Sequence, residues 1–199
     1  MTRILLAALA LPSIVAAQEL PTYAAPASRG FAIGVTGFTG GNWQPSGVDV
    51  ALLRPLGAPA SHGVVSLGVR LGSFVQDQAV LIGGSKGFFI TALLGVRRPI
   101  ANLAMVGTER DPNWVRLVAA PELGVSAGID SPLPEGGYWG TGALLFGLSF
   151  GGDQRIDENF AILVGPAGFA GKDGANLHLQ VTLRYQTSSG GTRRRGPPD

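Results

Sequence analysis

The chain has 199 residues, of which 31 are glycine, 14 are proline and none is cysteine. Only 14% of the residues are charged, whereas an average soluble protein has about 25%. These values exclude a disordered chain, a small disulfide-stabilised domain and a cysteine-ligated metal site. The length fits one domain with a sizeable core. Lysine occurs only at Lys86 and Lys172, far less often than on a water-exposed surface.

The N-terminus has the pattern of a cleaved secretory signal peptide, residues 1–17. Arg3 supplies the positive charge, residues 4–11 form the apolar stretch, and Val15-Ala16-Ala17 supplies the small residues before the cleavage site. The apolar stretch is too short for a membrane anchor helix, which needs about 20 residues. We expect residues 18–30 to form a lead-in segment.

The C-terminal segment 187–199 is predicted to be a flexible basic tail, with the run Arg193-Arg194-Arg195. Contact of this run with anionic lipid or a periplasmic polymer is the alternative. Without this run the chain is close to neutral, and no basic face interleaved with aromatic residues is visible. Nucleic acid is therefore not an expected partner.

Most of the remaining chain alternates between apolar and polar residues with a period of two, which is typical of β-strands. In residues 176–186, Leu177, Leu179 and Leu183 share one face, and His178, Gln180 and Arg184 share the other. Glycine, proline, aspartate and asparagine bound each such segment. The pattern predicts an all-β protein with eight strands: 31–40, 47–56, 64–73, 88–98, 114–128, 138–150, 158–169 and 176–186.

Such alternation fits either a soluble barrel with an apolar interior or a membrane barrel with an apolar exterior. The polar faces hold mainly small residues and a few arginines, which suits the narrow interior of eight strands. Arg70, Arg116 and Arg184 all fall on these faces, and an arginine facing the lipid midplane would cost about 2–4 kcal/mol. Arg98 falls on the aliphatic face at a strand end, where it can reach the headgroups. The membrane orientation is therefore favoured.

Aromatic residues lie at or near the predicted strand ends, as in the girdles that mark both membrane interfaces. Tyr138 and Phe150 share a face, and their separation along a tilted strand corresponds to roughly 30 Å along the membrane normal. The predicted girdle consists of Phe88, Trp114, Tyr138, Trp139, Phe150 and Tyr185.

Residues 31–186 resemble the small outer-membrane β-barrels of diderm bacteria, such as the transmembrane domain of outer membrane protein A. The strand that ends at Tyr185 is similar to the C-terminal assembly signal of that family. The resemblance implies an eight-stranded antiparallel up-and-down transmembrane β-barrel in the outer membrane, with its N-terminus in the periplasm. It also implies outer-membrane lipid and, during biogenesis, the barrel-assembly machinery as partners.

Two features depart from that family's pattern. The chain continues after Tyr185, and segment 99–112 would be an unusually long periplasmic turn. In addition, Pro121 and Pro166 fall inside predicted strands, where proline cannot donate to the ladder. We expect β-bulges or early strand ends at both prolines.

The candidate functional site is a network of polar side chains in the lumen. Buried charges need partners, so Glu122 is predicted to bond to one or more of Arg70, Arg116 and Arg184, with His178 and Gln180 nearby. Such a network would fill and brace the barrel. The alternative is an exposed Glu122, if Pro121 ends its strand.

No catalytic residue, metal site or cofactor is predicted. The chain has two histidines, His62 and His178, and no serine lies within two positions of His178, as lipid-modifying barrel enzymes would require. No metal-binding motif is present. We expect a non-enzymatic protein with a filled polar lumen and a structural or loop-mediated binding role. A soluble secreted or periplasmic barrel that binds an apolar ligand and an outer-membrane lipid-modifying enzyme remain alternatives.

Overall fold

The structure is a computed structural model that describes residues 30–40, 43–56, 63–76, 85–108, 111–129, 138–151, 160–171 and 174–188. The predicted signal peptide, most of the lead-in and the tail after Ser188 lie outside these residues. Within the described residues, no helix is long and apolar enough to cross a membrane.

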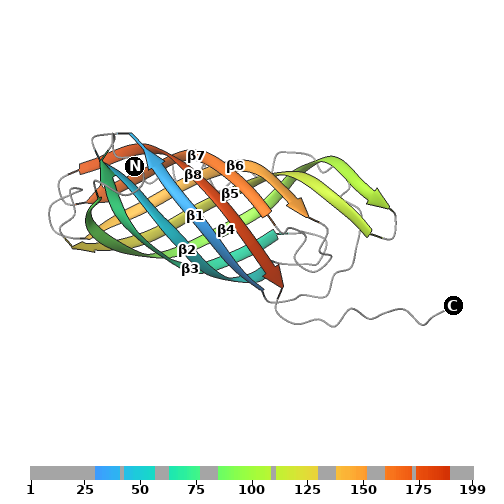
Figure 1. Ribbon diagram of the computed structural model, residues 1–199, viewed down its shortest axis with the longest axis horizontal. Coiled ribbons are helices and arrows are strands. Elements are labelled where there is room, and N and C mark those ends of the chain that lie inside the picture. The colour runs from blue at the N-terminus through green and yellow to red at the C-terminus, as the bar shows by residue number, and fades with distance from the viewer. Residues whose placement is uncertain are drawn as a thin grey trace.

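Eight strands follow one another along the chain, and each pairs with the next in antiparallel fashion (Figure 1). The first and last strands also pair, which closes the sheet into an up-and-down barrel and confirms the predicted fold class. We call the end where the first strand begins and the last strand ends the terminal end, and the opposite end the distal end. The strands are β1 (Gly30–Thr39), β2 (Trp43–Leu56), β3 (Gly63–Gln76), β4 (Ser85–Thr108), β5 (Asp111–Ile129), β6 (Tyr138–Gly151), β7 (Phe160–Gly171) and β8 (Gly174–Ser188).

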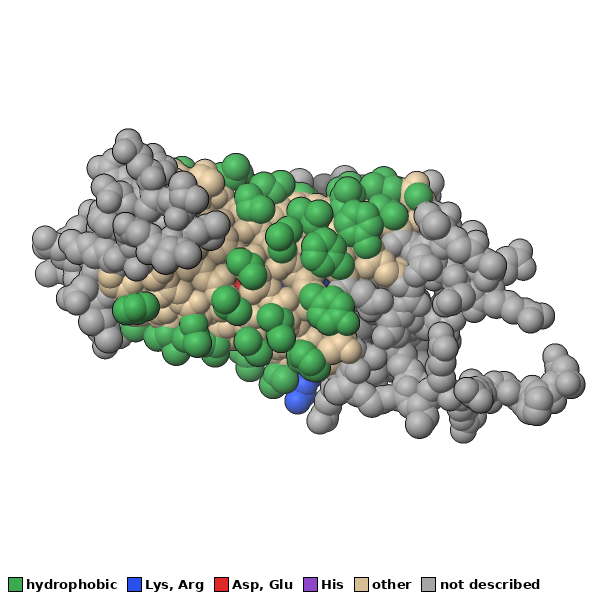
Figure 2. Space-filling model, in the orientation of Figure 1, with side chains coloured by type: hydrophobic (Ala, Val, Ile, Leu, Met, Phe, Trp, Pro, Cys, Tyr) green, Lys and Arg blue, Asp and Glu red, His purple; other side chains and the backbone are tan. Residues whose placement is uncertain are grey.

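Side chains alternate between the interior and the exterior of the barrel. In β8, Leu179 and Leu183 are exposed, whereas Gln180 and Arg184 are buried. Burial alternates in the same way along β1. Hydrophobic side chains accordingly dominate the outer surface of the described residues (Figure 2). The predicted orientation, with aliphatic residues outside and polar residues inside, is confirmed.

Pro121 and Pro166 neither end their strands nor form bulges, so this prediction was wrong. Pro121 pairs with Leu144 of β6, and Pro166 pairs with Leu179 of β8. On the other side of each proline, toward β4 and β6 respectively, the pairing is interrupted and then resumes in the same register. Because proline has no N–H to donate, the ladder is weakened on one side of the strand and kept on the other.

The predicted turn over segment 99–112 was also wrong, because β4 and β5 continue as a hairpin past the terminal end of the barrel (Figure 1). The two strands stay paired as far as Thr108 and Asp111. Pro99 pairs with Val118 on one side, and in the described residues the pairing of β4 with β3 stops at Arg97. A strand edge without a neighbour tolerates proline, so Pro99 does not end the strand.

The bulges lie elsewhere in β4. The β4–β5 register shifts between Pro99 and Ala101 and again between Asn102 and Ala104, where the hairpin leaves the barrel. The β3–β4 register shifts at Gly87, whose φ of 66° is a conformation that favours glycine. After this bulge, the side chains of β4 from Phe88 onward alternate between the outside and the inside of the barrel.

Glycines allow close contact between strands at several interior positions. A Cβ added at Gly147 in β6 would collide with the carbonyl oxygen of Ile162 in β7. A Cβ added at Gly37 in β1 would meet nothing within 4 Å. Gly147 faces the interior beside Leu163 and is crowded, whereas Gly37 lies on the outward row of β1 and is open.

We expect Gly147→Ala to lower the free energy of unfolding by about 1–3 kcal/mol, because the added methyl group forces β6 and β7 apart. Gly37→Ala should change it by less than about 1 kcal/mol. Urea titration of the protein refolded in detergent micelles measures both. Equal effects of the two substitutions would contradict the close β6–β7 contact.

Candidate functional site

A cluster of buried charges occupies the middle of the barrel interior. The carboxylate of Asp49 in β2 accepts two hydrogen bonds from the guanidinium of Arg70 in β3, from Nε at 2.6 Å and from Nη2 at 3.0 Å. The two residues are direct partners in the β2–β3 register. Strand pairing therefore places the two side chains next to each other. Because both are buried, each charge needs the opposite charge of the other to offset its desolvation.

Glu122 in β5 joins this pair to a second arginine. Its Oε1 accepts a hydrogen bond from Nη2 of Arg184 in β8 at 2.6 Å, and its Oε2 accepts one from Nη2 of Arg70 at 3.3 Å. Arg184 Nη2 also lies 3.8 Å from Asp49 Oδ2. Carboxylates and guanidiniums thus alternate around a closed ring whose formal charges cancel. We call Asp49, Arg70, Glu122 and Arg184 the charged ring.

Hydroxyl and amide groups complete the hydrogen bonding of the charged ring. Thr36 Oγ1 donates to Asp49 Oδ2 at 2.8 Å, so its lone pairs accept from Arg70 at 3.3 Å and from the Thr182 hydroxyl at 2.9 Å. The amide of Gln180 donates to Thr182 and to Glu122, both at 3.1 Å. The direction of each proton is therefore determined around the ring, which favours a single arrangement.

Glycines leave the space that the charged ring needs. Gly34 in β1 is the register partner of both Asp49 and Arg184. Because Gly34 has no side chain, the carboxylate and the guanidinium on either side of it can approach each other. Gly95 in β4 lies next to the ring in the same way, and a Cβ there would come within 2.6 Å of Ser66 Oγ. Small residues at these positions make room for large charged ones.

An aromatic layer fills the interior toward the distal end. Phe74, Phe89 and Trp139 contact one another with ring centroids 5.3–6.2 Å apart. Phe38 packs edge-on against Phe169 at 4.9 Å. All five side chains are buried. The layer lies in the barrel interior between the charged ring and the distal end.

His178 belongs to this aromatic layer. Its imidazole lies edge-on to Phe169, with centroids 5.0 Å apart, and to Phe38, with centroids 6.5 Å apart. The guanidinium carbon of Arg70 lies 5.3 Å from the centroid of the Phe38 ring. This cation–π contact joins the aromatic layer to the charged ring.

The interior toward the terminal end is mainly apolar, with two arginines near its margin. Arg97 Nη2 donates to Gln186 Oε1 at 2.5 Å, and Arg116 Nε donates to Asn102 Oδ1 at 3.1 Å. Both arginines are buried. The apolar cluster consists of Val118, Ala120, Leu145, Ala161 and Leu163.

The residues predicted for the lumen network separate into two groups. All of them are buried inside the barrel, and the structure brings together Arg70, Glu122, Gln180 and Arg184. Glu122 thus bonds to two of the three arginines named for it, while Arg116 and His178 lie apart from this group. Arg116 donates to Asn102 near the terminal end, and His178 packs among aromatic rings. Burial of Glu122 also excludes the alternative in which it is exposed.

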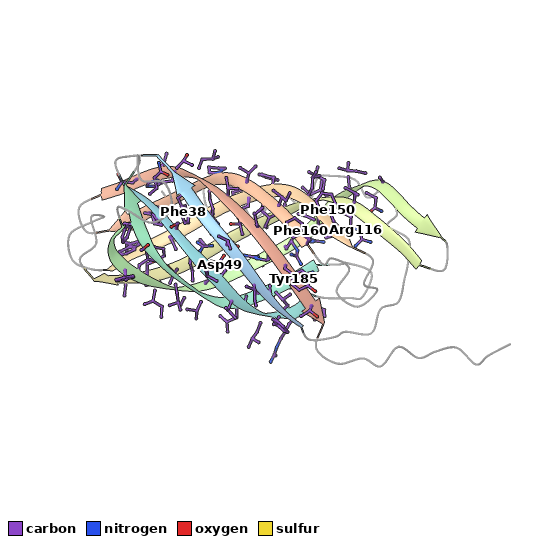
Figure 3. The ribbon with its side chains drawn as sticks, in the orientation of Figure 1. Phe38, Asp49, Arg116, Phe150, Phe160 and Tyr185 are labelled. Carbon is purple, nitrogen blue, oxygen red and sulfur yellow. The ribbon has the colours of Figure 1, made fainter. Side chains whose placement is uncertain are left out.

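The residues predicted for the aromatic girdle differ in the face of the barrel on which they lie. Phe88 and Tyr185 point outward, with 69% and 55% of their surface exposed. Phe150 lies against Phe160 with ring centroids 6.4 Å apart, and both lie with Tyr185 near the terminal end (Figure 3). The strand positions of Trp114 and Tyr138 are described, but their side chains lie outside the described part.

Trp139 was predicted to belong to the outward-facing girdle. Instead, its side chain points into the barrel, and only 3% of its surface is exposed. It follows Tyr138 directly, and consecutive residues of a strand point to opposite faces. Tyr138 and Trp139 therefore cannot both point toward the outside of the barrel. A Cβ at Gly128 in the neighbouring strand would lie 2.8 Å from the Trp139 ring, so this glycine provides space for the indole.

Asp49 and the phenylalanines of the aromatic layer were missed. Asp49 lies between Val48 and Val50, and once those valines are assigned to the exterior, the carboxylate must face the interior. The same alternation turns Phe89 inward when Phe88 faces outward. The period of two contains this signal, and it applies to aromatic residues near strand ends as it does to any other residue.

The interior geometry supports ion pairing and packing. The carboxylates of the charged ring are engaged by arginine. In the part of the chain that the structure describes, no group of three or more histidine, aspartate or glutamate residues could hold a metal ion. The fold and the interior together define an eight-stranded up-and-down barrel with an apolar exterior and buried charges at its centre.

No family model matches the chain, and no curated protein matches it. Among solved structures, the chain is similar to the outer membrane protein Ail of Yersinia pestis in a phospholipid bilayer nanodisc. The identity is 13% and the TM-score is 0.35, with 81% of this chain and 100% of that chain covered. The fold is defined by the closed strand pairing described above.

We expect Glu122→Gln to lower the free energy of unfolding by about 3 kcal/mol, because Asp49 alone would then balance two buried guanidiniums. Adding Arg184→Gln should recover part of the loss, since one balanced pair would remain. Ser126→Ala, which removes a 2.6 Å hydrogen bond to Thr91, is an uncharged control expected to cost about 1 kcal/mol.

Urea titration in detergent micelles measures these free energies for each variant. Effects of Glu122→Gln and Arg184→Gln that simply add in the double variant would contradict energetic coupling within the charged ring.

Proposed function

We propose that this chain is a non-enzymatic barrel that spans the bacterial outer membrane, with a closed interior and a structural or loop-mediated binding role. The observation that carries the proposal is the distribution of side chains, which is the inverse of that in a soluble barrel. Charges are buried at the centre, and aliphatic residues cover the outside.

The exterior is apolar over every side of the barrel. On β2, Val48, Val50 and Leu52 have 49%, 54% and 67% of their surface exposed. Exposed aliphatic or aromatic side chains lie on each of the other strands as well. A monomeric soluble protein rarely exposes an apolar patch of more than a few hundred Å². Hydrocarbon is the environment that accommodates such a surface.

The height of the apolar surface supports the same proposal. On β8 the outward row runs from Leu177 to Tyr185. A tilted strand needs about 9–11 residues to cross the hydrocarbon core, and this row matches that length. Tyr185 closes the row at the terminal end, where an aromatic residue is typical of the membrane interface.

The interior supports a closed barrel. The aromatic layer, the charged ring and the apolar cluster follow one another along the axis, and each is made of buried side chains. A soluble carrier of an apolar ligand would need a cavity with apolar walls, whereas charges occupy the centre here. For catalysis, His178 would need a nucleophile beside it, and its described ring neighbours are Phe38 and Phe169.

The cellular location rests on the outward aliphatic surface together with the sequence. A secretory signal over residues 1–17 would export the chain, and the β8 strand would present the alternating C-terminal pattern to the barrel-assembly machinery. Outer-membrane lipid would then cover the exterior.

We expect Val69→Arg to destabilise the protein in phospholipid vesicles by about 2–4 kcal/mol, because the charge would enter the hydrocarbon near its midplane. Val69 lies in the middle of the outward row of β3 and is 41% exposed. Leu56→Arg, at the last residue of β2, is the matched control and should cost at most about 1 kcal/mol.

In cells, the wild-type chain should sediment with the outer membrane and migrate differently on gels before and after boiling. Recovery of the folded protein in the soluble fraction without detergent, together with a neutral effect of Val69→Arg, would contradict the membrane proposal.

A closed interior also predicts that the reconstituted barrel conducts no steady ionic current in planar lipid bilayers. The aromatic layer and the charged ring leave the axis occupied by side chains. Single-channel recording at neutral pH tests this expectation, with an open porin as the positive control. A reproducible conductance from the purified wild-type barrel would contradict the closed interior.

A further inference from the structure

The exterior of the barrel carries charge at two positions among the residues whose side chains are described. Arg54 on β2 and Arg98 on β4 are both exposed, whereas the other described charged side chains are buried. Both exceptions are arginines. An outer surface that is otherwise apolar thus has a localised positive charge.

The two arginines flank the same strand at the terminal end. Arg54 lies two residues before the end of β2 at Leu56. Arg98 directly follows Arg97, the last residue of β4 that pairs with β3. β3 runs between them and begins at Gly63. A basic side chain projects from the margin of the apolar surface toward this end in Figure 2.

Aromatic residues mark the membrane interface at the same end of the barrel. Phe150, Phe160 and Tyr185 are successive register partners on β6, β7 and β8, and Figure 3 shows them grouped near that end. Each lies close to the point where its strand ends or begins. Interfacial aromatic belts lie at headgroup level, which puts the strand ends that carry Arg54 and Arg98 at headgroup level too.

The surface between the arginines fits an amphiphile. The outward row of β3 includes Leu67, Val69 and Leu71, which are 63%, 41% and 58% exposed. It leads from the terminal end toward the middle of the barrel. No ion pair joins Arg54 or Arg98 to a carboxylate in the described ranges, so no described acid competes for either guanidinium. Two cationic groups thus lie beside the terminal end of the apolar outward row of β3.

We propose that Arg54 and Arg98 form a binding site for the phosphate of an anionic phospholipid, whose acyl chain lies along the outward face of β3. This inference rests on the proposed membrane-spanning function. Guanidinium groups bind phosphate through paired hydrogen bonds, and charge complementarity selects an anionic lipid over a zwitterionic one. The site faces the leaflet at the terminal end of the barrel.

The site predicts selective lipid association, which spin-labelled lipids measure directly. The full chain is reconstituted in phosphatidylcholine vesicles with trace spin-labelled phosphatidylglycerol or spin-labelled phosphatidylcholine. Electron paramagnetic resonance gives the motionally restricted fraction of each label. We expect the wild-type chain to favour phosphatidylglycerol about fivefold, which is the effect of about one arginine near an anionic surface. High salt should reduce this ratio.

The variant R54Q/R98Q should lose the preference, whereas R193Q/R194Q, which removes the same charge from the tail, should keep it. The single variant R98Q should show an intermediate ratio and serves if the double variant folds poorly. The mobility of unboiled samples on gels verifies folding. Equal ratios in the wild type and R54Q/R98Q, or loss in R193Q/R194Q alone, would overturn the site.

The failure of the membrane proposal gives a different result. If neither label shows a restricted component in the wild type, the chain does not span the bilayer, and both proposals are overturned. A restricted component without preference for phosphatidylglycerol overturns the lipid site and leaves the spanning barrel supported.

Discussion

Closure of the sheet is the constraint on which the rest of this structure depends. Because β8 pairs with β1, the ladder has no free edge around the barrel, and each side chain can point only inward or outward. In lipid this closure also satisfies the backbone N–H and C=O groups within the protein. Polar side chains are then confined to a narrow interior, where an unpaired charge is costly. The charged ring meets that cost by cancelling two carboxylates against two guanidiniums.

The charged ring also joins strands that the sheet does not join. Strand pairing connects only neighbours, whereas Glu122 on β5 bonds to Arg70 on β3 and to Arg184 on β8. These bonds cross the interior and tie opposite walls together. The inward glycines are part of the same arrangement, because Gly34 and Gly95 provide the space through which the long side chains reach. The two glycines therefore make room for the long arginine and glutamate side chains of the charged ring.

The period of two predicted the fold and the interior faces because it follows from strand geometry alone. It placed Arg70, Glu122 and Arg184 inside, and consistent use of it would also have found Asp49 and turned Trp139 inward. Depth along the axis was harder to predict. His178 and Gln180 share a face and lie two residues apart, yet one packs among aromatic rings and the other bonds to Glu122. Such a difference depends on which side chains the opposite wall presents, and local sequence does not contain that information.

The β4–β5 hairpin has features that oppose edge-to-edge strand pairing between copies of this chain. Past Arg97, in the described residues, β4 has no β3 partner, so its outer margin would offer a row of donors and acceptors to a strand from another copy. Pro99 removes a donor from that row, and the two bulges that follow break its regular spacing. A foreign strand finds no continuous template there. The ribbon can project from the barrel without seeding sheet-to-sheet aggregation.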